Sequence, residues 1–214
     1  MTETAMCPNA TDLLRIDKFA RSSIKRQKAC AIWLTGLSGA GKSTIATLAD
    51  QVLFSRGNHT YILDGDEIRS ALNKDLGFDA LARSENIRRV SELARLMVDS
   101  GLIVLCALIS PFRHDRSLAR SRFAPGEFYE VFVDAPLPVA EARDPKGLYQ
   151  LARRGEIRGF TGIDSEYEPP EFPDLHLRTD SCTPTDAVAS IIKLLENNKI
   201  IGINHRSVPS DVDL

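Results

Sequence analysis

The sequence has almost no net charge, and this limits what the protein can bind. Its 27 lysines and arginines are balanced by 29 aspartates and glutamates, which gives a formal net charge of −2. A protein that follows a nucleic acid needs a broad basic surface. We therefore expect no nucleic-acid partner, and we expect any bound anion to be small and held by a few arginines.

Paired cysteines and long apolar segments are also missing. The four cysteines lie far apart, form no C-x-x-C motif and follow no recognisable secretory leader, so reduced thiols and a cytoplasmic location are the simplest expectation. The longest apolar stretch, residues 101–109, is too short to cross a bilayer and fits a central parallel strand. No membrane partner is expected, and the chain contains no internal repeat.

What the chain does have is the composition of one globular α/β domain. It has 214 residues, of which 43% are hydrophobic and 26% charged. Alternation of strand-like and helix-like segments predicts a doubly wound, parallel, five-stranded sheet flanked by helices. The expected strands are residues 31–35, 60–63, 102–109, 127–133 and 174–178.

Apolar spacing and capping residues predict the helices that matter most. A helix is expected over residues 11–28, within an N-terminal extension covering residues 1–30. Another is expected over residues 84–100, with Ser84 as its N-cap. The last begins at Thr183, which is followed by a proline at the first helical position.

Two segments lack such periodicity. Residues 143–173 are rich in glycine, proline and arginine, and a long irregular insertion in a compact domain is typical of a mobile lid, although a disordered loop is the alternative. Residues 201–214 are expected to be a flexible tail. The main domain would then cover residues 31–200.

A glycine-rich loop follows the first expected strand and precedes a helical pattern. It reads G-L-S-G-A-G-K-S, which fits G-x-x-x-x-G-K-[ST] and not the dinucleotide pattern G-x-G-x-x-G. Such a loop directs backbone N–H groups and a helix N-terminus at phosphates, with Lys42 reaching the β and γ phosphates and Ser43 binding Mg²⁺. The sequence therefore predicts a nucleoside-triphosphate site. Its residues are Gly36, Leu37, Ser38, Gly39, Ala40, Gly41, Lys42, Ser43 and Thr44.

Polar residues at other strand ends are candidates for the second half of the site. In a parallel sheet these ends line one crevice, which places Asp64, Asp66 and Ser110 near the γ-phosphate. Asp66 can orient an attacking hydroxyl and accept its proton, and Asp64 can hold Mg²⁺. The alternative for both carboxylates is an Asx turn that caps the next helix.

Further along the chain, Arg69, Arg83 and Asn86 could converge on one anionic group. Isolated arginines on helices are more often solvated surface charges. Phe78 and Phe160 lie in glycine-rich surroundings, where two exposed aromatic rings suggest a base sandwich. The alternative is that each ring packs its own loop onto the core.

Together these motifs resemble the adenylylsulfate kinase family. The most specific blocks are K-G-L-Y at residues 146–149 and F-T-G-I-D at residues 160–164, and the likeness covers about residues 12–198. The resemblance implies a P-loop kinase fold and ATP-dependent phosphorylation of the 3′-hydroxyl of adenosine 5′-phosphosulfate. The products would be 3′-phosphoadenosine 5′-phosphosulfate and ADP, in sulfate assimilation. It also implies Mg²⁺ and a homodimer.

The resemblance also assigns roles to residues. Lys42, Asp66 and Ser110 would be catalytic, Cys182 would lie beside the adenine of ATP, and Arg153 or Arg154 could contact the transferred phosphoryl group. Ser110 is often described in this family as a phosphoserine intermediate, but direct transfer needs no such step, and we expect Ser110 to position the substrate. The implied substrate-binding residues are Asp66, Ile68, Arg69, Phe78, Arg83, Asn86, Ile109, Ser110, Lys146, Gly159 and Phe160.

Three other functions are compatible with a phosphate loop. A kinase acting on gluconate, shikimate or a nucleoside monophosphate would not need two aromatic rings together with an Arg-Asn pair. A GTP-dependent switch is disfavoured because the Asn-Lys-x-Asp guanine motif is missing. An inactive kinase-like domain would be expected to lose Lys42 or Asp66, and the chain has both.

Overall fold

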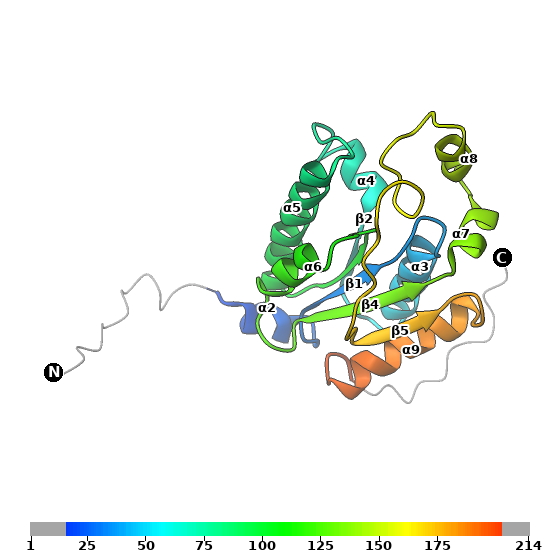
Figure 1. Ribbon diagram of the computed structural model, residues 1–214. Coiled ribbons are helices and arrows are strands. Elements are labelled where there is room, and N and C mark those ends of the chain that lie inside the picture. The colour runs from blue at the N-terminus through cyan, green and yellow to red at the C-terminus, as the bar shows by residue number, and fades with distance from the viewer. Residues whose placement is uncertain (1–15, 203–214) are drawn as a thin grey trace.

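Five parallel strands form a single sheet in the order β2-β3-β1-β4-β5 (Figure 1). The computed structural model describes residues 16–202, so the tail expected at residues 201–214 and the first part of the helix expected over residues 11–28 lie largely outside them. The expected doubly wound parallel sheet is confirmed. The strands are β1 (Cys30–Thr35), β2 (Thr60–Asp64), β3 (Ile103–Ala107), β4 (Phe128–Asp134) and β5 (Leu175–Arg178).

Helices cover both faces of the sheet. One face packs against α3 and α9, and the other packs against α5 and α6 (Figure 1). Within residues 16–202, none of the helices combines the length and apolar character that crossing a bilayer requires. The helices are α2 (Lys18–Ile24), α3 (Lys42–Ser55), α4 (Gly65–Ser70), α5 (Ala80–Asp99), α6 (Arg113–Arg120), α7 (Leu137–Arg143), α8 (Leu148–Arg153) and α9 (Pro184–Asn197).

The sheet divides the core into two halves, and its central strand β1 contributes side chains to both. Ile32 and Leu34 of this strand pack into the half that includes α3 and α9. Ala31 and Trp33 point the other way and pack with α5. Every residue of β1 is buried. This explains why the strand is a continuous apolar run and not an alternating one.

The strand order also fixes the place of the site. From β1 the chain crosses to β2 at one edge, and after β3 it crosses to β4 on the other side. Connections that leave in opposite directions open a crevice at the carboxyl ends of the strands. The glycine-rich loop after β1, Asp64 at the end of β2 and Ser110 after β3 all lie at this edge.

The start of α5 differs from the sequence-based expectation. Ser84 is not the N-cap, because the helix begins at Ala80 and the Asp79 carboxylate accepts a hydrogen bond from the Ala82 amide at 2.9 Å. Ser84 lies one turn inside the helix and donates to Asp115 of α6. The apolar stripe begins only at Ile87, so it gave no signal for the first two turns. The capping box expected at Thr183 is present.

The segment expected to be an irregular lid contains one helix that was not anticipated. This helix is α8, which begins after Gly147 in a left-handed conformation. Tyr149 of α8 is fully buried, and its hydroxyl donates to the carbonyl of Ser38 at 2.9 Å. Six residues are too few to show helical periodicity clearly in the sequence. Movement of residues 143–173 as a lid stays a prediction.

Replacing Gly39 by alanine tests how tightly the glycine-rich loop is packed. Gly39 has φ +73°, and an added Cβ would lie 2.6 Å from the carbonyl oxygen of Ala140. Gly57 has a similar φ of +81° with nothing within 4 Å, so G57A is a matched control for backbone strain alone. We expect G57A to cost about 1 kcal/mol and G39A about 2 kcal/mol more, measured by urea unfolding. Equal losses would contradict the close approach.

Candidate active site

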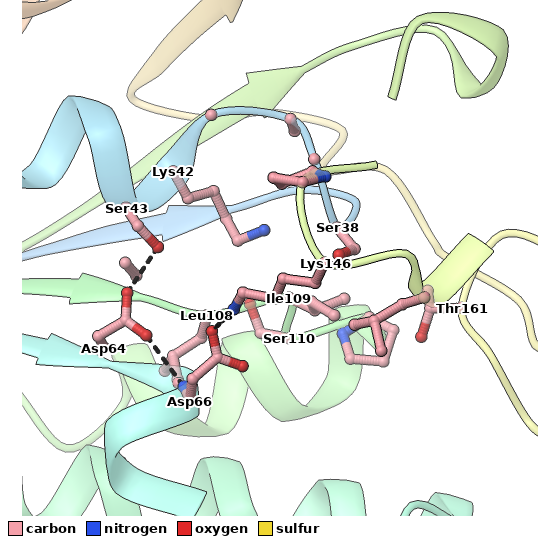
Figure 2. Close-up of a pocket in the computed structure, with 18 of the residues that line it drawn as sticks. Ser38, Lys42, Ser43, Asp64, Asp66, Leu108, Ile109, Ser110, Lys146 and Thr161 are labelled. Carbon is pink, nitrogen blue, oxygen red and sulfur yellow. Dashed lines mark hydrogen bonds and ion pairs between the residues drawn. The ribbon is translucent and has the colours of Figure 1, made fainter. Parts of the chain in front are cut away.

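A large cavity lies at the carboxyl ends of the strands, with a volume of about 1300 Å³ (Figure 2). A pocket for one small molecule is usually about 300–1000 Å³, so this cavity has room for more than one ligand. It brings together most of the residues singled out in the sequence. These are Ser38, Gly39, Ala40, Gly41, Lys42, Ser43, Thr44, Asp64, Asp66, Arg69, Phe78, Arg83, Asn86, Ile109, Ser110, Lys146, Gly159, Phe160 and Cys182.

Three residues of the expected ATP and substrate sites do not line the cavity. Ile68 was expected to bind substrate, but its side chain is buried in the core beside α5. An apolar side chain on the inner face of the short helix α4 gains more from that burial than from exposure in a polar cavity. Gly36 and Leu37 begin the loop, and their carbonyl groups accept hydrogen bonds from Lys42.

Lys42 is buried at the base of the glycine-rich loop. Its Nζ donates to the carbonyl oxygens of Gly36 and Leu37, at 2.9 and 2.8 Å. The pKa of Lys42 is lowered to about 7, mainly by burial; Asp64 opposes this shift, and Lys146 contributes a smaller lowering. Both hydrogen-bond acceptors are uncharged, so an anion in the cavity would be the natural counter-charge for this lysine.

Ser43 of the glycine-rich loop and Asp64 at the end of β2 are hydrogen-bonded to each other. The Ser43 hydroxyl donates to Asp64 Oδ2 at 2.6 Å, and Asp64 Oδ1 accepts from the Asp66 amide at 2.9 Å (Figure 2). Asp64 is therefore the N-cap of α4, as one of the two alternatives predicted, and it also faces the loop. Across residues 16–202 no three histidine, cysteine or carboxylate side chains cluster as a metal site. A hydroxyl and a carboxylate nevertheless suit Mg²⁺, which usually completes its shell with water and phosphate.

Asp66 and Lys146 form an ion pair across the cavity (Figure 2). Asp66 lies in the first turn of α4, and Lys146 lies between α7 and α8. Both side chains are more than half exposed. The candidate general base is therefore beside a cation and open to a ligand.

Arg83 connects the two loops at the other end of the cavity. Its guanidinium donates to the carbonyls of Phe78 and Gly159 at 2.8 and 2.6 Å, and to Thr161 Oγ1 at 2.7 Å. These acceptors are all uncharged. Arg83 is buried, and burial is the main cause that lowers its pKa. Asn86, one turn further along α5, is also buried.

The two aromatic rings have different environments. Phe78 is 61% exposed, and the Arg69 guanidinium lies 4.6 Å from its ring centroid. Phe160 was expected to be exposed but is only 8% exposed, because its ring packs edge-on against Tyr149 at 4.9 Å. The alternative reading, that the ring packs its loop onto the core, describes Phe160 better, although both rings border the cavity.

Ser110 has an unusual backbone conformation, and its hydroxyl group both donates and accepts hydrogen bonds within the protein. Its φ is +40°, which is rare for a residue with a side chain. Its Oγ donates to Thr35 Oγ1 at 2.9 Å and accepts from Trp33 Nε1 at 3.2 Å. Ser110 is almost fully buried. This arrangement suits a positioning residue better than a nucleophile.

The arginines of the lid segment are placed differently from the expectation. Arg153 pairs with Glu141 and Arg154 with Glu156, and neither arginine lines the cavity. Arg143 and Arg158 do line it. The block R-D-P-K-G-L-Y that begins at Arg143 could have signalled this position.

Sequence reasoning also missed how the glycine-rich loop is supported. The Arg143 guanidinium donates to the carbonyls of Thr179 and Gly39, at 2.6 and 3.4 Å. The Thr179 hydroxyl donates to the carbonyl of Ala40 at 2.9 Å. The contacts with Gly39 and Ala40 join segments more than one hundred residues apart, and no local pattern reveals them.

Sequence comparisons identify related proteins. The family described as Adenylylsulphate kinase matches residues 28–178. An adenylyl-sulfate kinase from Burkholderia ambifaria is 58% identical over 179 residues, covering 84% of this chain and 99% of the relative. The bifunctional enzyme CysN/CysC from Xylella fastidiosa is 60% identical over 182 residues, which cover 85% of this chain but only 29% of that enzyme.

Solved structures agree with the sequence relatives. The APS kinase CysC of Mycobacterium tuberculosis, in complex with AMPPNP and APS, has a TM-score of 0.77 and 47% identity, covering 79% of this chain and 99% of the other. A gluconokinase from Sinorhizobium meliloti has a TM-score of 0.50 and 17% identity over 80% of this chain and 96% of its own, which shows a shared fold alone. With its sheet order, its phosphate loop and these matches, the chain belongs to the adenylylsulfate kinase family.

Proposed function

We propose that the protein transfers the γ-phosphoryl group of ATP to the 3′-hydroxyl of adenosine 5′-phosphosulfate (APS). The products are 3′-phosphoadenosine 5′-phosphosulfate (PAPS) and ADP, and the reaction serves sulfate assimilation. The observation that carries the proposal is one cavity lined both by the phosphate loop and by Asp66, Arg83 and Phe78. A family member solved with AMPPNP and APS together supports two nucleotides in such a cavity.

On the ATP side, residues 36–44 bind the phosphates and Cys182 lies beside the adenine. Lys42 contacts the β and γ phosphates, whose charge compensates its burial. Ser43 and Asp64 would hold Mg²⁺, because their oxygens lie 2.6 Å apart at the loop. When bound, the metal neutralises charge on the transferred phosphoryl group.

On the acceptor side, the buried guanidinium of Arg83 and the amide of Asn86 bind the phosphosulfate, together with Arg69. Phe78 covers the adenine of APS. Phe160 forms the opposite wall from a more buried position. The remaining proposed contacts are with Ile109, Ser110, Lys146 and Gly159.

The chemical step is a direct in-line transfer. Asp66 accepts the proton of the 3′-hydroxyl as the new O–P bond forms and the bond from the γ-phosphorus to the bridging oxygen of ADP breaks. Lys42 stabilises the charge on the transferred group. The Ser110 hydroxyl bonds to Thr35 and Trp33, which supports a route without a phosphoserine.

We also propose a homodimer and a cytoplasmic location. The apolar side chains of Phe19 and Ile24 on α2 are 77% and 83% exposed, which suits an interface. Cys30, Cys106 and Cys182 are free thiols, as expected in a reducing compartment.

The acceptor is tested by offering the purified protein Mg-ATP with APS, AMP, shikimate or gluconate in parallel. We expect ADP release with APS alone, at a turnover on the order of 1–100 s⁻¹, and a product heavier by one phosphoryl group at the 3′ position. ADP release and product mass are followed by coupled assay and mass spectrometry. Turnover with another acceptor and none with APS would overturn the proposal.

The role of Asp66 is tested by D66N, with E67Q as a matched control. Both residues are in the first turn of α4, but only Asp66 lines the cavity. D66N should lower kcat for APS about 10²- to 10⁴-fold with little change in ATP binding, because the general base is lost. E67Q should stay within about twofold of the parent. Similar losses in both variants would exclude this role for Asp66.

The lowered pKa of Lys42 predicts proton uptake when nucleotide binds. At pH 8 a lysine with a pKa of about 7 is mostly neutral, and the phosphates should raise its pKa. Binding of a non-hydrolysable ATP analogue at pH 8 should therefore take up close to one proton. At pH 6 the lysine is already charged, so uptake should be small. Calorimetry in buffers of different ionisation enthalpy measures both values, and equal uptake at both pH values would contradict the assignment.

A further inference from the structure

Arg116 of α6 is a buried cation that connects three separate segments. Its side chain is only 2% exposed. Its Nη1 donates to the carbonyl of Ser110, its Nη2 to the carbonyl of Glu168 and its Nε to the carboxylate of Glu130, each at 2.7 Å. One guanidinium therefore joins the loop after β3, the chain beyond α8 and strand β4.

The contact with Ser110 matters because this residue has a strained backbone. A left-handed conformation costs a residue with a side chain about 1–2 kcal/mol, and it persists only where the surroundings hold it. The hydroxyl of Ser110 is held by Thr35 and Trp33, and its carbonyl is held by Arg116. Ser110 lines the acceptor side of the cavity together with Ile109.

The contact with Glu168 places a second segment against the same loop. The Glu168 amide donates to the carbonyl of Pro111 at 2.9 Å, directly after Ser110. The hydroxyl of the preceding Tyr167 lies 3.0 Å from Thr35 Oγ1, and the Arg116 guanidinium is 5.8 Å from the Tyr167 ring centroid. Arg116 thus lies where the floor of the acceptor site meets the chain that returns from residues 159–161, which border the cavity.

We infer that Arg116 is a positioning residue for the acceptor half of the reaction, acting through Ser110 and the backbone at Glu168. The inference deepens the proposed function and rests on it for the identity of the acceptor. It does not place Arg116 in contact with substrate. A lysine at this position keeps the charge but offers one nitrogen, which cannot reach three divergent acceptors at once.

The kinetic test compares R116K with R113K. Arg113 is on the same helix and bonds to the carbonyl of Pro169 and to Glu171, but not to Ser110. We expect R116K to raise KM for APS about tenfold while KM for ATP changes less than about twofold, and R113K to leave both nearly unchanged. Equal changes in the two variants, or a change in KM for ATP as large as that for APS, would overturn the inference.

A spectroscopic test needs no substrate. Trp33 is the only tryptophan in the chain, and its Nε1 donates to the Ser110 hydroxyl. R116K should shift the fluorescence maximum of Trp33 in the unliganded protein, whereas R113K should not. An unchanged maximum in R116K would overturn the link between Arg116 and Ser110. This readout stays valid even if APS proves not to be the acceptor, so the two failures are distinguishable.

A second variant covers the case in which R116K does not fold by circular dichroism. E130Q keeps an oxygen acceptor for Arg116 Nε but removes the charge that anchors the guanidinium. The same fluorescence shift and the same selective rise in KM for APS are expected, to a smaller extent. A folded E130Q that shows neither change would also overturn the inference.

Discussion

The burial of β1 on both faces is the constraint on which the rest of the structure depends. All six residues of this strand are buried, and it pairs with β3 on one side and β4 on the other. A strand held in this way delivers the glycine-rich loop to a fixed place at its carboxyl end. The loop then packs against the chain after β4, where an added Cβ at Gly39 would meet the Ala140 carbonyl. The glycine-rich loop is thus held in place by packing that is continuous with the core.

A second constraint is electrostatic. Lys42 and Arg83 are buried at two ends of one cavity, and each donates its hydrogen bonds to uncharged oxygens. Neutral acceptors satisfy the donors but do not neutralise the positive charge, and Asp64 near Lys42 and Asp79 and Asp164 near Arg83 offset only part of the cost of burial. Burial is the main cause that lowers the pKa of both side chains. Two anionic ligands would remove this cost, and APS and ATP each carry an anionic group for one of the two ends.

The sequence predicted the structural features that depend on residues close together along the chain. All five strands, the phosphate loop and the capping box at Thr183 follow from short windows, because periodicity and glycine spacing are local properties. Ser84 as an N-cap was wrong, since Asp79, five residues earlier, caps the helix before the apolar stripe begins. The burial of Phe160 depends on Tyr149 and the contacts of Arg116 depend on the chain near residue 168. Such long-range contacts leave no periodic signal.

The hydrogen bonds of the Ser110 hydroxyl bear on whether this residue can act as a nucleophile. A nucleophilic serine needs its hydroxyl directed at the phosphoryl group with a base to take its proton. Here the hydroxyl proton is donated to Thr35, and the oxygen accepts from Trp33. The Thr35 hydroxyl in turn donates to the Ile109 carbonyl at 2.8 Å. Neither acceptor in this series of hydrogen bonds, a hydroxyl and a backbone carbonyl, is a base that could take the proton of Ser110. Phosphorylating Ser110 would require breaking this buried network, whereas the direct transfer that we propose leaves it intact.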